Sequence, residues 1–266
     1  MTRLRVAAAQ IALVDGDYAA NLASIGAAVA TAGPDHDLLV LPETATSGFA
    51  SRDDVERLAE PLDGPTVARL RDWSRAYDLT IACGLAERDA GRLFNTAVVV
   101  ADGAVQIAYR KTQLWVGETG IFTPGDTFGS AAWHGTRIGA LICFDVEFPE
   151  TARAVAVAGA RVIAVCNGNM APFGPNHRIA ACARAMENQA FLVMCNRVGQ
   201  GRIDSFAGGS LIVDPAGRIL AEADGASETL LSAEIGLNEI ETARHTYDYL
   251  QLRRIAFPAK AGPPGP

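Results

Sequence analysis

The chain has 266 residues, of which 49% are hydrophobic and 20% are charged, and its formal net charge is −7. This composition is typical of a folded globular protein and excludes wholesale disorder. The acidic balance, together with the lack of a lysine- and arginine-rich run, argues against a nucleic-acid partner.

The first residues predict a β-strand rather than a targeting signal. The apolar run over residues 4–13 is interrupted by Gln10 and has no cleavage-type ending. No apolar segment in the sequence approaches the roughly 20 residues that cross a bilayer. We therefore expect a cytoplasmic protein with no membrane partner.

Strand-like and helix-like patterns alternate in the first third of the chain. Asp17 is a candidate helix cap, Gly33 marks the end of that helix, and Pro65 lies in the first turn of the next one. The patterns predict helices over residues 17–33 and 65–78, and strands over residues 4–13, 37–43 and 79–88.

Two hairpins and further strand–helix pairs follow. Asp102-Gly103 is a strong hairpin signal within residues 92–111, and Pro215-Ala216-Gly217 is the turn of a second hairpin within residues 209–223. Helices are predicted over residues 147–160 and 176–190, and strands over residues 136–143, 161–167, 191–199 and 228–236.

These elements predict an α/β protein with mixed sheets flanked by helices. No internal repeat or linker divides the chain, so we expect one domain over residues 1–256. Residues 257–266 form a Pro/Gly-rich tail that cannot be a regular element.

The five cysteines are dispersed and odd in number, which does not favour a disulfide framework. Four of them read as small buried hydrophobic residues. The four histidines are scattered, so no metal site is expected. Among them only His177 is placed near the candidate site described next, where a helix-cap or surface role is favoured.

Three reactive side chains stand at the ends of predicted strands. They are Glu43 in "LPET", Lys111 in "YRKTQL" and Cys143 in "LICFDVEFPE". A nearby ammonium lowers the pKa of a thiol and stabilises an oxyanion. A shielded carboxylate can take the thiol proton and pass it to a leaving amine. Together the three suffice for amide hydrolysis without a cofactor.

With these motifs in this order, the sequence resembles the carbon–nitrogen hydrolase (nitrilase) superfamily. Further matches are "FTPGD" before the cysteine strand, and "ARAMENQAFLVMCNRVG" and "GGSLIVDPAGRIL" after it. The resemblance covers nearly the full length. It implies a four-layer α-β-β-α sandwich and a homodimer or higher homo-oligomer.

The family's roles carry over by position. The resemblance implies that Glu43 is the general base and later the general acid, and that Cys143 forms a thioester acyl-enzyme. Lys111 and the backbone N–H of Phe144 would stabilise the oxyanion. Glu118 would be the second glutamate of amidase members, which positions the substrate amide or holds Lys111. One departure is Gln113, where many relatives carry histidine.

The residues after the cysteine favour the amidase branch. Several relatives place an arginine that clamps a substrate carboxylate shortly after the cysteine, where this sequence has Val146-Glu147. Glu147 would repel such a carboxylate, so we expect neutral or cationic aliphatic amides. The alternative is that Glu147 pairs with a structural cation such as Arg153 or Arg178. The loops beside the motifs supply candidate pocket walls, namely Phe49, Trp115, Met170 and Phe173.

Other functions stay open at this point. Within the superfamily they are a nitrilase, an N-carbamoyl or ω-amide hydrolase, and an acyltransferase. Outside catalysis, an inactive scaffold would be expected to have lost Glu43, Lys111 or Cys143, and all three are present. A redox sensor would need a second cysteine beside Cys143 in the sequence, and none is there.

Overall fold

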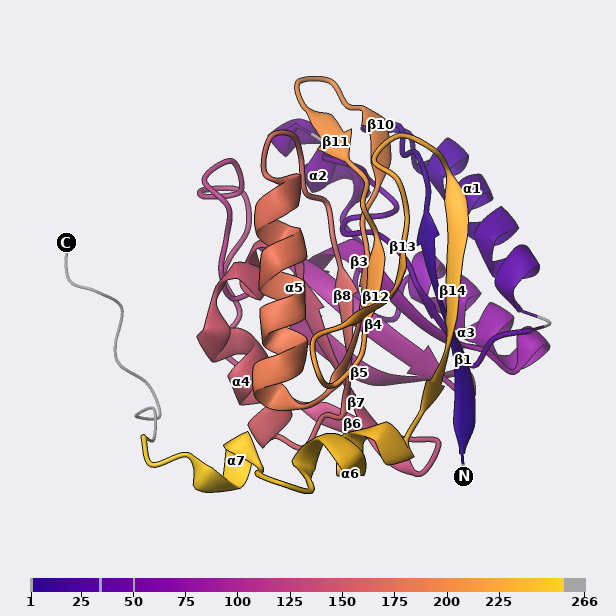
Figure 1. The fold of residues 1–266 in the computed structure, drawn as a ribbon. Helices are drawn as coiled ribbons and strands as arrows, with labels where there is room; N and C mark the ends of the chain where they lie inside the picture. Colours follow the sequence, from indigo (N-terminus) through magenta and orange to yellow (C-terminus); the bar gives the residue numbers. More distant parts are fainter. Residues whose placement is uncertain (1, 34, 50, 256–266) are drawn as a thin grey trace.

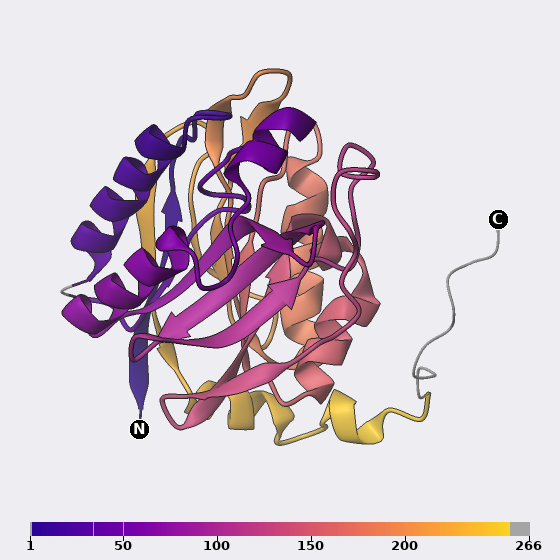
Figure 2. The ribbon, with the colours of Figure 1, turned by 180° about the vertical axis from the view of Figure 1, so that it is seen from behind.

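Two mixed β-sheets form the centre of the molecule. The structure is a computed structural model that describes residues 2–33, 35–49 and 51–255. Each sheet has six strands, and strands of one contact strands of the other across the interface (Figures 1 and 2). In order, the first sheet contains β14 (Thr229–Gly236), β1 (Arg3–Gln10), β2 (Leu38–Val40), β3 (Thr80–Asp89), β4 (Arg92–Ala101) and β5 (Ala104–Arg110).

In both sheets the central strands run parallel and the strands beside them run antiparallel, and in the first sheet the parallel strands are β1, β2 and β3. In the second sheet β7, β8 and β9 run parallel, whereas β12 and β6 pair antiparallel to them. In order it contains β13 (Ile219–Glu222), β12 (Leu211–Val213), β9 (Phe191–Cys195), β8 (Val162–Cys166), β7 (Thr136–Ile142) and β6 (Ser130–Trp133). A separate hairpin is formed by β10 (Val198–Gln200) and β11 (Ser205–Ala207).

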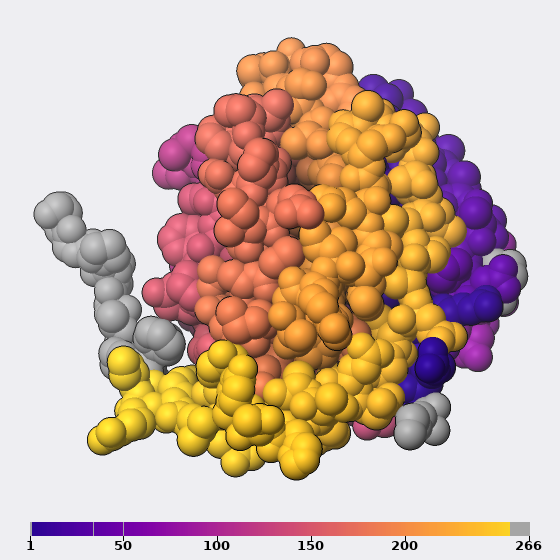
Figure 3. Space-filling view, in the orientation of Figure 1, coloured from indigo at the N-terminus to yellow at the C-terminus, as the bar shows by residue number. Residues whose placement is uncertain are grey.

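Helices cover the outer face of each sheet (Figures 1 and 2). In Figure 3 the C-terminal segment lies across the lower end of α5, and α7 contacts α5. The first sheet is covered by α1 (Tyr18–Ala32) and α3 (Pro65–Tyr77), and the second by α4 (Pro149–Val157) and α5 (Gly174–Asn188). The shorter helices are α2 (Arg52–Leu58), the 3-10 helix η1 (Cys143–Glu147), α6 (Asn238–Arg244) and α7 (Tyr249–Leu252).

The core follows these layers. One apolar cluster lies between the sheets and continues under α4 and α5, and it includes Val6, Val40 and Val165. A second cluster joins α1 and α3 to the first sheet through residues such as Ile25 and Leu70. Helix, sheet, sheet and helix therefore stack as four layers, and the predicted fold is confirmed.

Most predicted elements are present. Asp17 caps α1 by accepting a hydrogen bond from the Ala20 N–H, and the hairpin turns at Asp102-Gly103. The structure adds α2, β6, β11, α6 and α7, which no periodic pattern had indicated. The predicted tail, residues 257–266, lies outside the described residues.

The described residues contain neither a helix suited to cross a membrane nor a cluster of side chains suited to hold a metal ion. None of their helices combines the length and apolarity that crossing a bilayer requires. No group of three or more histidine, cysteine, aspartate or glutamate side chains in the same ranges is arranged to hold a metal ion.

Candidate active site

Cys143 occupies the sharp turn between β7 and η1. It follows the last residue of β7 and begins the 3-10 helix. Its φ of 43° is in the left-handed region, which residues with a side chain rarely adopt. Such conformations persist where surrounding contacts hold them, and they are concentrated at active sites. The turn presents the thiol while keeping the residue buried, with 6% of its surface exposed.

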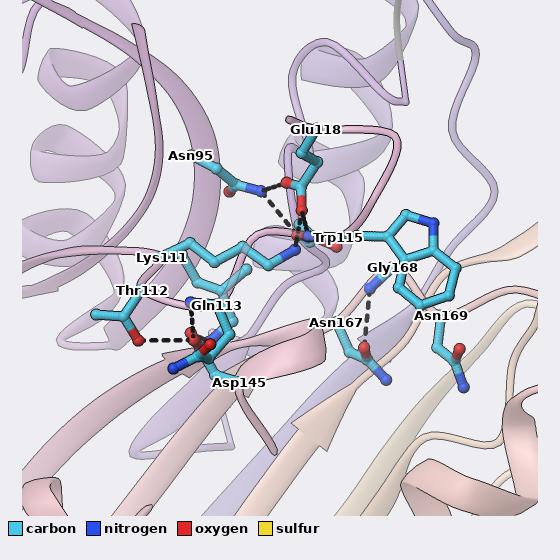
Figure 4. A network of polar contacts seen from close by, with 12 residues as sticks. Asn95, Lys111, Thr112, Gln113, Trp115, Glu118, Asp145, Asn167, Gly168 and Asn169 are labelled. Atoms are coloured by element: carbon cyan, nitrogen blue, oxygen red, sulfur yellow. Dashed lines mark hydrogen bonds and ion pairs between the residues drawn. The ribbon is translucent and has the colours of Figure 1, made fainter. Parts of the chain in front are cut away.

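Lys111 is held between two glutamates. Its Nζ donates to Glu43 Oε1 at 2.7 Å and to Glu118 Oε2 at 2.5 Å, and all three side chains are almost fully buried. Asn95, in the middle of β4, donates from Nδ2 to Glu43 Oε1 at 2.7 Å and to Glu118 Oε1 at 2.6 Å. Figure 4 shows Asn95 and Glu118 beside the end of the lysine side chain. No described residue donates to Glu43 Oε2, so this buried carboxylate oxygen has no hydrogen-bond partner among them.

Two glycines allow the backbone to close around Glu43. A Cβ on Gly84 would lie 2.6 Å from the Glu43 Cα, and a Cβ on Gly168 would lie 2.6 Å from Glu43 Oε2. Real side chains are not found at such distances, so both positions require glycine. The Gly168 N–H donates to Asn167 Oδ1 at 3.0 Å, and the Gly168 backbone also acts to lower the pKa of the Cys143 thiol.

Burial dominates the ionisation of this cluster. It raises the pKa of Cys143 well above its ordinary value, the Glu43 charge adds to this, and the Lys111 ammonium opposes it only in part. Burial also raises the pKa of Glu43 above its ordinary 4.5, against the charge of Lys111. For Lys111, burial acts to lower the pKa, but the charges of Glu43, Cys143 and Glu118 raise it overall.

The expectation that the ammonium gives Cys143 a lowered pKa is therefore wrong in its net effect. Lys111 acts in the expected direction, but transfer of the thiolate out of water costs more than the ammonium returns. Glu43 Oε2 has no donor among the described residues, which makes it a candidate acceptor for the thiol proton.

Asp145 ties the lysine loop to the cysteine turn. Its burial raises its pKa, and hydrogen bonds from neutral donors oppose the shift. Gln113 contributes only its backbone N–H to this contact, so the histidine of relatives is not needed for it. The four donors to Asp145 are Tyr109 Oη at 2.8 Å, Thr112 Oγ1 at 3.0 Å, the Gln113 N–H at 2.9 Å and the Ile142 N–H at 3.1 Å.

A small pocket opens beside the thiol. Trp115 lies edge-on to Phe144 and to Phe173, with ring centroids 5.1 and 5.4 Å apart. These contacts fix one wall as a rigid aromatic surface. The lining residues are Phe49, Trp115, Cys143, Phe144, Glu147, Asn169, Met170, Phe173 and His177, so every predicted pocket residue is brought to this site.

The partner predicted for Glu147 is wrong. Arg178 pairs instead with Glu222, and Arg153 donates to the Glu187 carbonyl. Glu147 Oε1 lies 3.0 Å from His177 Nε2. His177 is only 3% exposed and makes no helix-capping bond, which corrects the surface role favoured for it. The side chain points inward because its position on α5 faces η1 and the pocket.

Sequence reasoning missed Asn95, Gly168 and Asn169, and it placed His177 near the site but with another role. Each of these residues carried some signal. Asn95 is a buried polar residue in a mainly apolar strand, a placement that requires buried partners. Gly168 and Asn169 follow the buried strand β8 in the same way that Cys143 follows β7. His177 gave the weakest signal, because its pairing with Glu147 depends on how α5 packs against η1.

Comparison with known proteins agrees with this geometry. The family model described as carbon–nitrogen hydrolase matches residues 5–245. A Pseudomonas protein named (R)-stereoselective amidase is 47% identical over 95% of this chain and 92% of its own length.

Solved structures give the same picture. A superfamily protein of Xanthomonas campestris with an arsenic adduct in its active site has a TM-score of 0.89 at 26% identity, covering 97% of this chain and 99% of that one. A mutant amidase from Nesterenkonia sp. AN1, with acrylamide added to its active-site cysteine, has a TM-score of 0.81 at 29% identity, covering 94% and 96%.

The matches extend along nearly all of the chain, and the relatives include enzymes of the branch predicted from the motif after the cysteine. The predictions of an amidase-like hydrolase of non-peptide carbon–nitrogen bonds and of a small-molecule amide substrate are confirmed. The chain belongs to the carbon–nitrogen hydrolase family.

Proposed function

We propose that the enzyme cleaves carboxamides through a thioester on Cys143, with Glu43 moving the protons and Lys111 stabilising the oxyanion. The observation that carries this proposal is the buried cluster in which Lys111 binds one oxygen of Glu43 and leaves Oε2 without a donor. A carboxylate placed this way keeps its basicity, because burial raises its pKa.

In the first half-reaction, the Cys143 sulfur attacks the amide carbon while its proton passes to Glu43. The carbonyl oxygen becomes an oxyanion that accepts hydrogen bonds from Lys111 Nζ and the Phe144 N–H. Glu43 then gives the proton to the amide nitrogen. The carbon–nitrogen bond breaks, ammonia or an amine leaves, and the acyl group stays on the sulfur.

In the second half-reaction, water replaces the departed amine. Glu43 takes a proton from the water as the oxygen attacks the thioester carbon, and the same donors hold the second oxyanion. The carbon–sulfur bond breaks, the acid leaves and the sulfur recovers its proton from Glu43. No cofactor is needed for either half.

Glu118 and Asn95 act as positioning residues in this scheme. Glu118 accepts from Lys111 Nζ and from the Trp115 N–H, at 2.5 and 2.8 Å, so it fixes the ammonium and one pocket wall together. Asn95 bridges the two carboxylates and holds them close despite their like charge. The geometry favours holding Lys111 over contact with the substrate as the role of Glu118.

The pocket supports a small acyl group without a carboxylate. Its walls are mainly aromatic, and its one acidic side chain is Glu147. A substrate carboxylate in this volume would face the charge of Glu147 at close range. Neutral or cationic aliphatic amides suit the pocket better than N-carbamoyl amino acids or ω-amides of dicarboxylates.

Intact-protein mass spectrometry tests the mechanism. Incubation with butyramide should give a transient mass increase equal to a butyryl group on the wild type and none on Cys143→Ala, which should keep its fold. Retained hydrolysis in Cys143→Ala would contradict the mechanism. Faster turnover of the matched nitrile, butyronitrile, would favour a nitrilase instead.

We also propose that the enzyme is a homodimer joined through its helical face. Four exposed apolar side chains support this, and they lie on the contacting helices α4, α5 and α7: Val157 (51% exposed), Ile179 (69%), Met186 (40%) and Leu252 (66%). Light scattering should give the mass of a dimer or larger oligomer, and Ile179→Glu should lower it. A monomeric wild type would contradict the proposal.

Two further proposals concern the chain as a whole. Residues 1–256 form one domain, which is supported by β14 pairing with β1 along its full length. The second proposal is that the protein is cytoplasmic, which is supported by its five free cysteines, because the cytoplasm keeps thiols reduced. Partial proteolysis that released a stable fragment would contradict a single domain.

A further inference from the structure

His177 and Glu147 form a polar corner in a pocket that is otherwise mainly apolar and aromatic. Both residues line the pocket beside Cys143, and the distance between His177 Nε2 and Glu147 Oε1 is 3.0 Å. Neither residue is used in the acyl-transfer steps above. We propose that this corner binds an amino group of the substrate, so that amino-substituted amides are the preferred substrates, an inference that rests on the proposed amidase function.

The hydrogen bonds of His177 indicate which kind of ligand group the corner would bind. Because Glu147 is an acceptor, we assign the ring proton to Nε2, and in a neutral imidazole Nδ1 is then an acceptor. No described residue forms a hydrogen bond with Nδ1, although the atom is buried. A buried acceptor without a partner is costly. A ligand that supplies an N–H would remove this cost.

The charge of Glu147 points to the same ligand. Its side chain is 28% exposed, and no lysine or arginine of the described ranges forms an ion pair with it. A neutral imidazole does not cancel the carboxylate charge. The corner therefore offers the negative charge of Glu147 and, on the other side of the imidazole ring, an acceptor without a partner, and an ammonium group, which has only donors, suits either.

A carboxylate-bearing substrate is the competing ligand. Asn169 also lines the pocket, and its buried Nδ2 is a donor without a partner. It could serve a carboxylate or the oxygen of a neutral acyl group. Repulsion between two charges in a partly buried site exceeds one neutral hydrogen bond several-fold, so Glu147 decides against the carboxylate.

Matched substrates separate this inference from the proposed function. β-Alaninamide and butyramide have nearly the same shape, but only the first has an ammonium group. Succinamate presents a carboxylate at a similar distance. We expect kcat/KM for β-alaninamide to exceed that for butyramide by about tenfold or more, mainly through KM, and succinamate to be the poorest of the three.

Variants then assign the preference to the corner. Glu147→Gln keeps the shape but removes the charge, and should reduce the ratio of β-alaninamide to butyramide by about tenfold. His177→Phe should also reduce the ratio, whereas His177→Asn, which keeps an acceptor near the Nδ1 position, should retain part of it. Arg178→Gln is the matched control, because it breaks the neighbouring exposed pair with Glu222, and it should leave the ratio unchanged.

The outcomes are distinct. If butyramide is hydrolysed and β-alaninamide is not preferred, the inference is wrong and the proposed function stands. A preference for succinamate would mean that the histidine presents a donor, and would also overturn the inference. An unchanged ratio in Glu147→Gln would do the same. If none of the three amides is hydrolysed, the proposed function fails and this inference fails with it.

Discussion

Asp145 and Glu43 are both buried carboxylates of the candidate site, but their oxygens are satisfied in different ways. Figure 4 shows the groups around Asp145 on one side of the lysine and Glu118 with Asn95 on the other. Both oxygens of Asp145 accept two hydrogen bonds each, all from neutral donors. Glu43 accepts two bonds on Oε1, one of them from an ammonium, and none from the described residues on Oε2.

The difference separates anchoring from chemistry. A carboxylate with four donors is locked in place and has no lone pair free for a reacting proton. A buried carboxylate oxygen without a hydrogen-bond donor lowers the stability of the fold, and such oxygens are found mainly at functional sites. We therefore expect substitutions at Glu43 to act on the chemical step and those at Asp145 to act on geometry and stability.

Glu43→Gln should have the largest effect of the comparison. It keeps the shape and a hydrogen-bond acceptor for Lys111 but cannot take the thiol proton, and loss of a general base costs about 10²–10⁴-fold in rate. We expect kcat to fall by this factor with the thermal midpoint close to that of the wild type. Single-turnover measurement of acyl-enzyme formation on butyramide checks it. An acylation rate within threefold of wild type would contradict the assignment of the base.

Asp145→Asn should have a smaller effect on rate and a larger one on stability. In the variant, two donors that now bond a carboxylate oxygen would face the Nδ2 amide group, which is itself a donor. Each buried group left without a partner lowers stability by about 1–3 kcal/mol. We expect a lower thermal midpoint and a fall in kcat of about 10–100-fold, because a shift of the cysteine turn of about 1 Å is costly. Tyr109→Phe removes only one of the four donors and is the graded control.

If Asp145 had only a structural role, its substitution would lower the thermal midpoint without slowing acylation in the folded enzyme. If Asp145 positions Cys143, acylation should slow in Asp145→Asn. The acid limb of the pH–rate profile should stay in place, because Glu43 is unchanged. A shifted limb in this variant would mean that the two clusters do not act separately.

Glu118→Gln tests the electrostatic link within the Glu43 cluster. The negative charge of Glu118 is one of the contributions that raise the pKa of Glu43, after burial. Glu43 must be ionised to act as a base, so the rate rises with pH through its raised pKa. Removing the Glu118 charge should move this limb to lower pH, with a loss in kcat of about tenfold from poorer holding of Lys111. A limb that moves to higher pH would contradict the assignment.

The sequence predicted the reactive residues of this site better than their surroundings. Glu43, Lys111 and Cys143 stand at strand ends, so short motifs were enough to place them at one edge of the fold. The effect of burial on the Cys143 pKa could not be predicted, because it depends on how many layers cover the thiol. The partner of Glu147 was also missed, since any of several cations could have been packed against η1.

Gln113→His should have the smallest effect, and it tests how far a family residue can vary without changing the anchor. Gln113 contributes its backbone N–H to Asp145, at 2.9 Å, and every residue other than proline has that donor. We expect kcat/KM within about twofold of wild type and stability within about 0.5 kcal/mol, which is usual for changes outside buried networks. Gln113→Pro is the matched variant that removes the N–H, and it should show a fall in activity approaching that of Asp145→Asn. Equal loss in both variants would mean that the side chain matters and that the anchor is not made by the backbone alone.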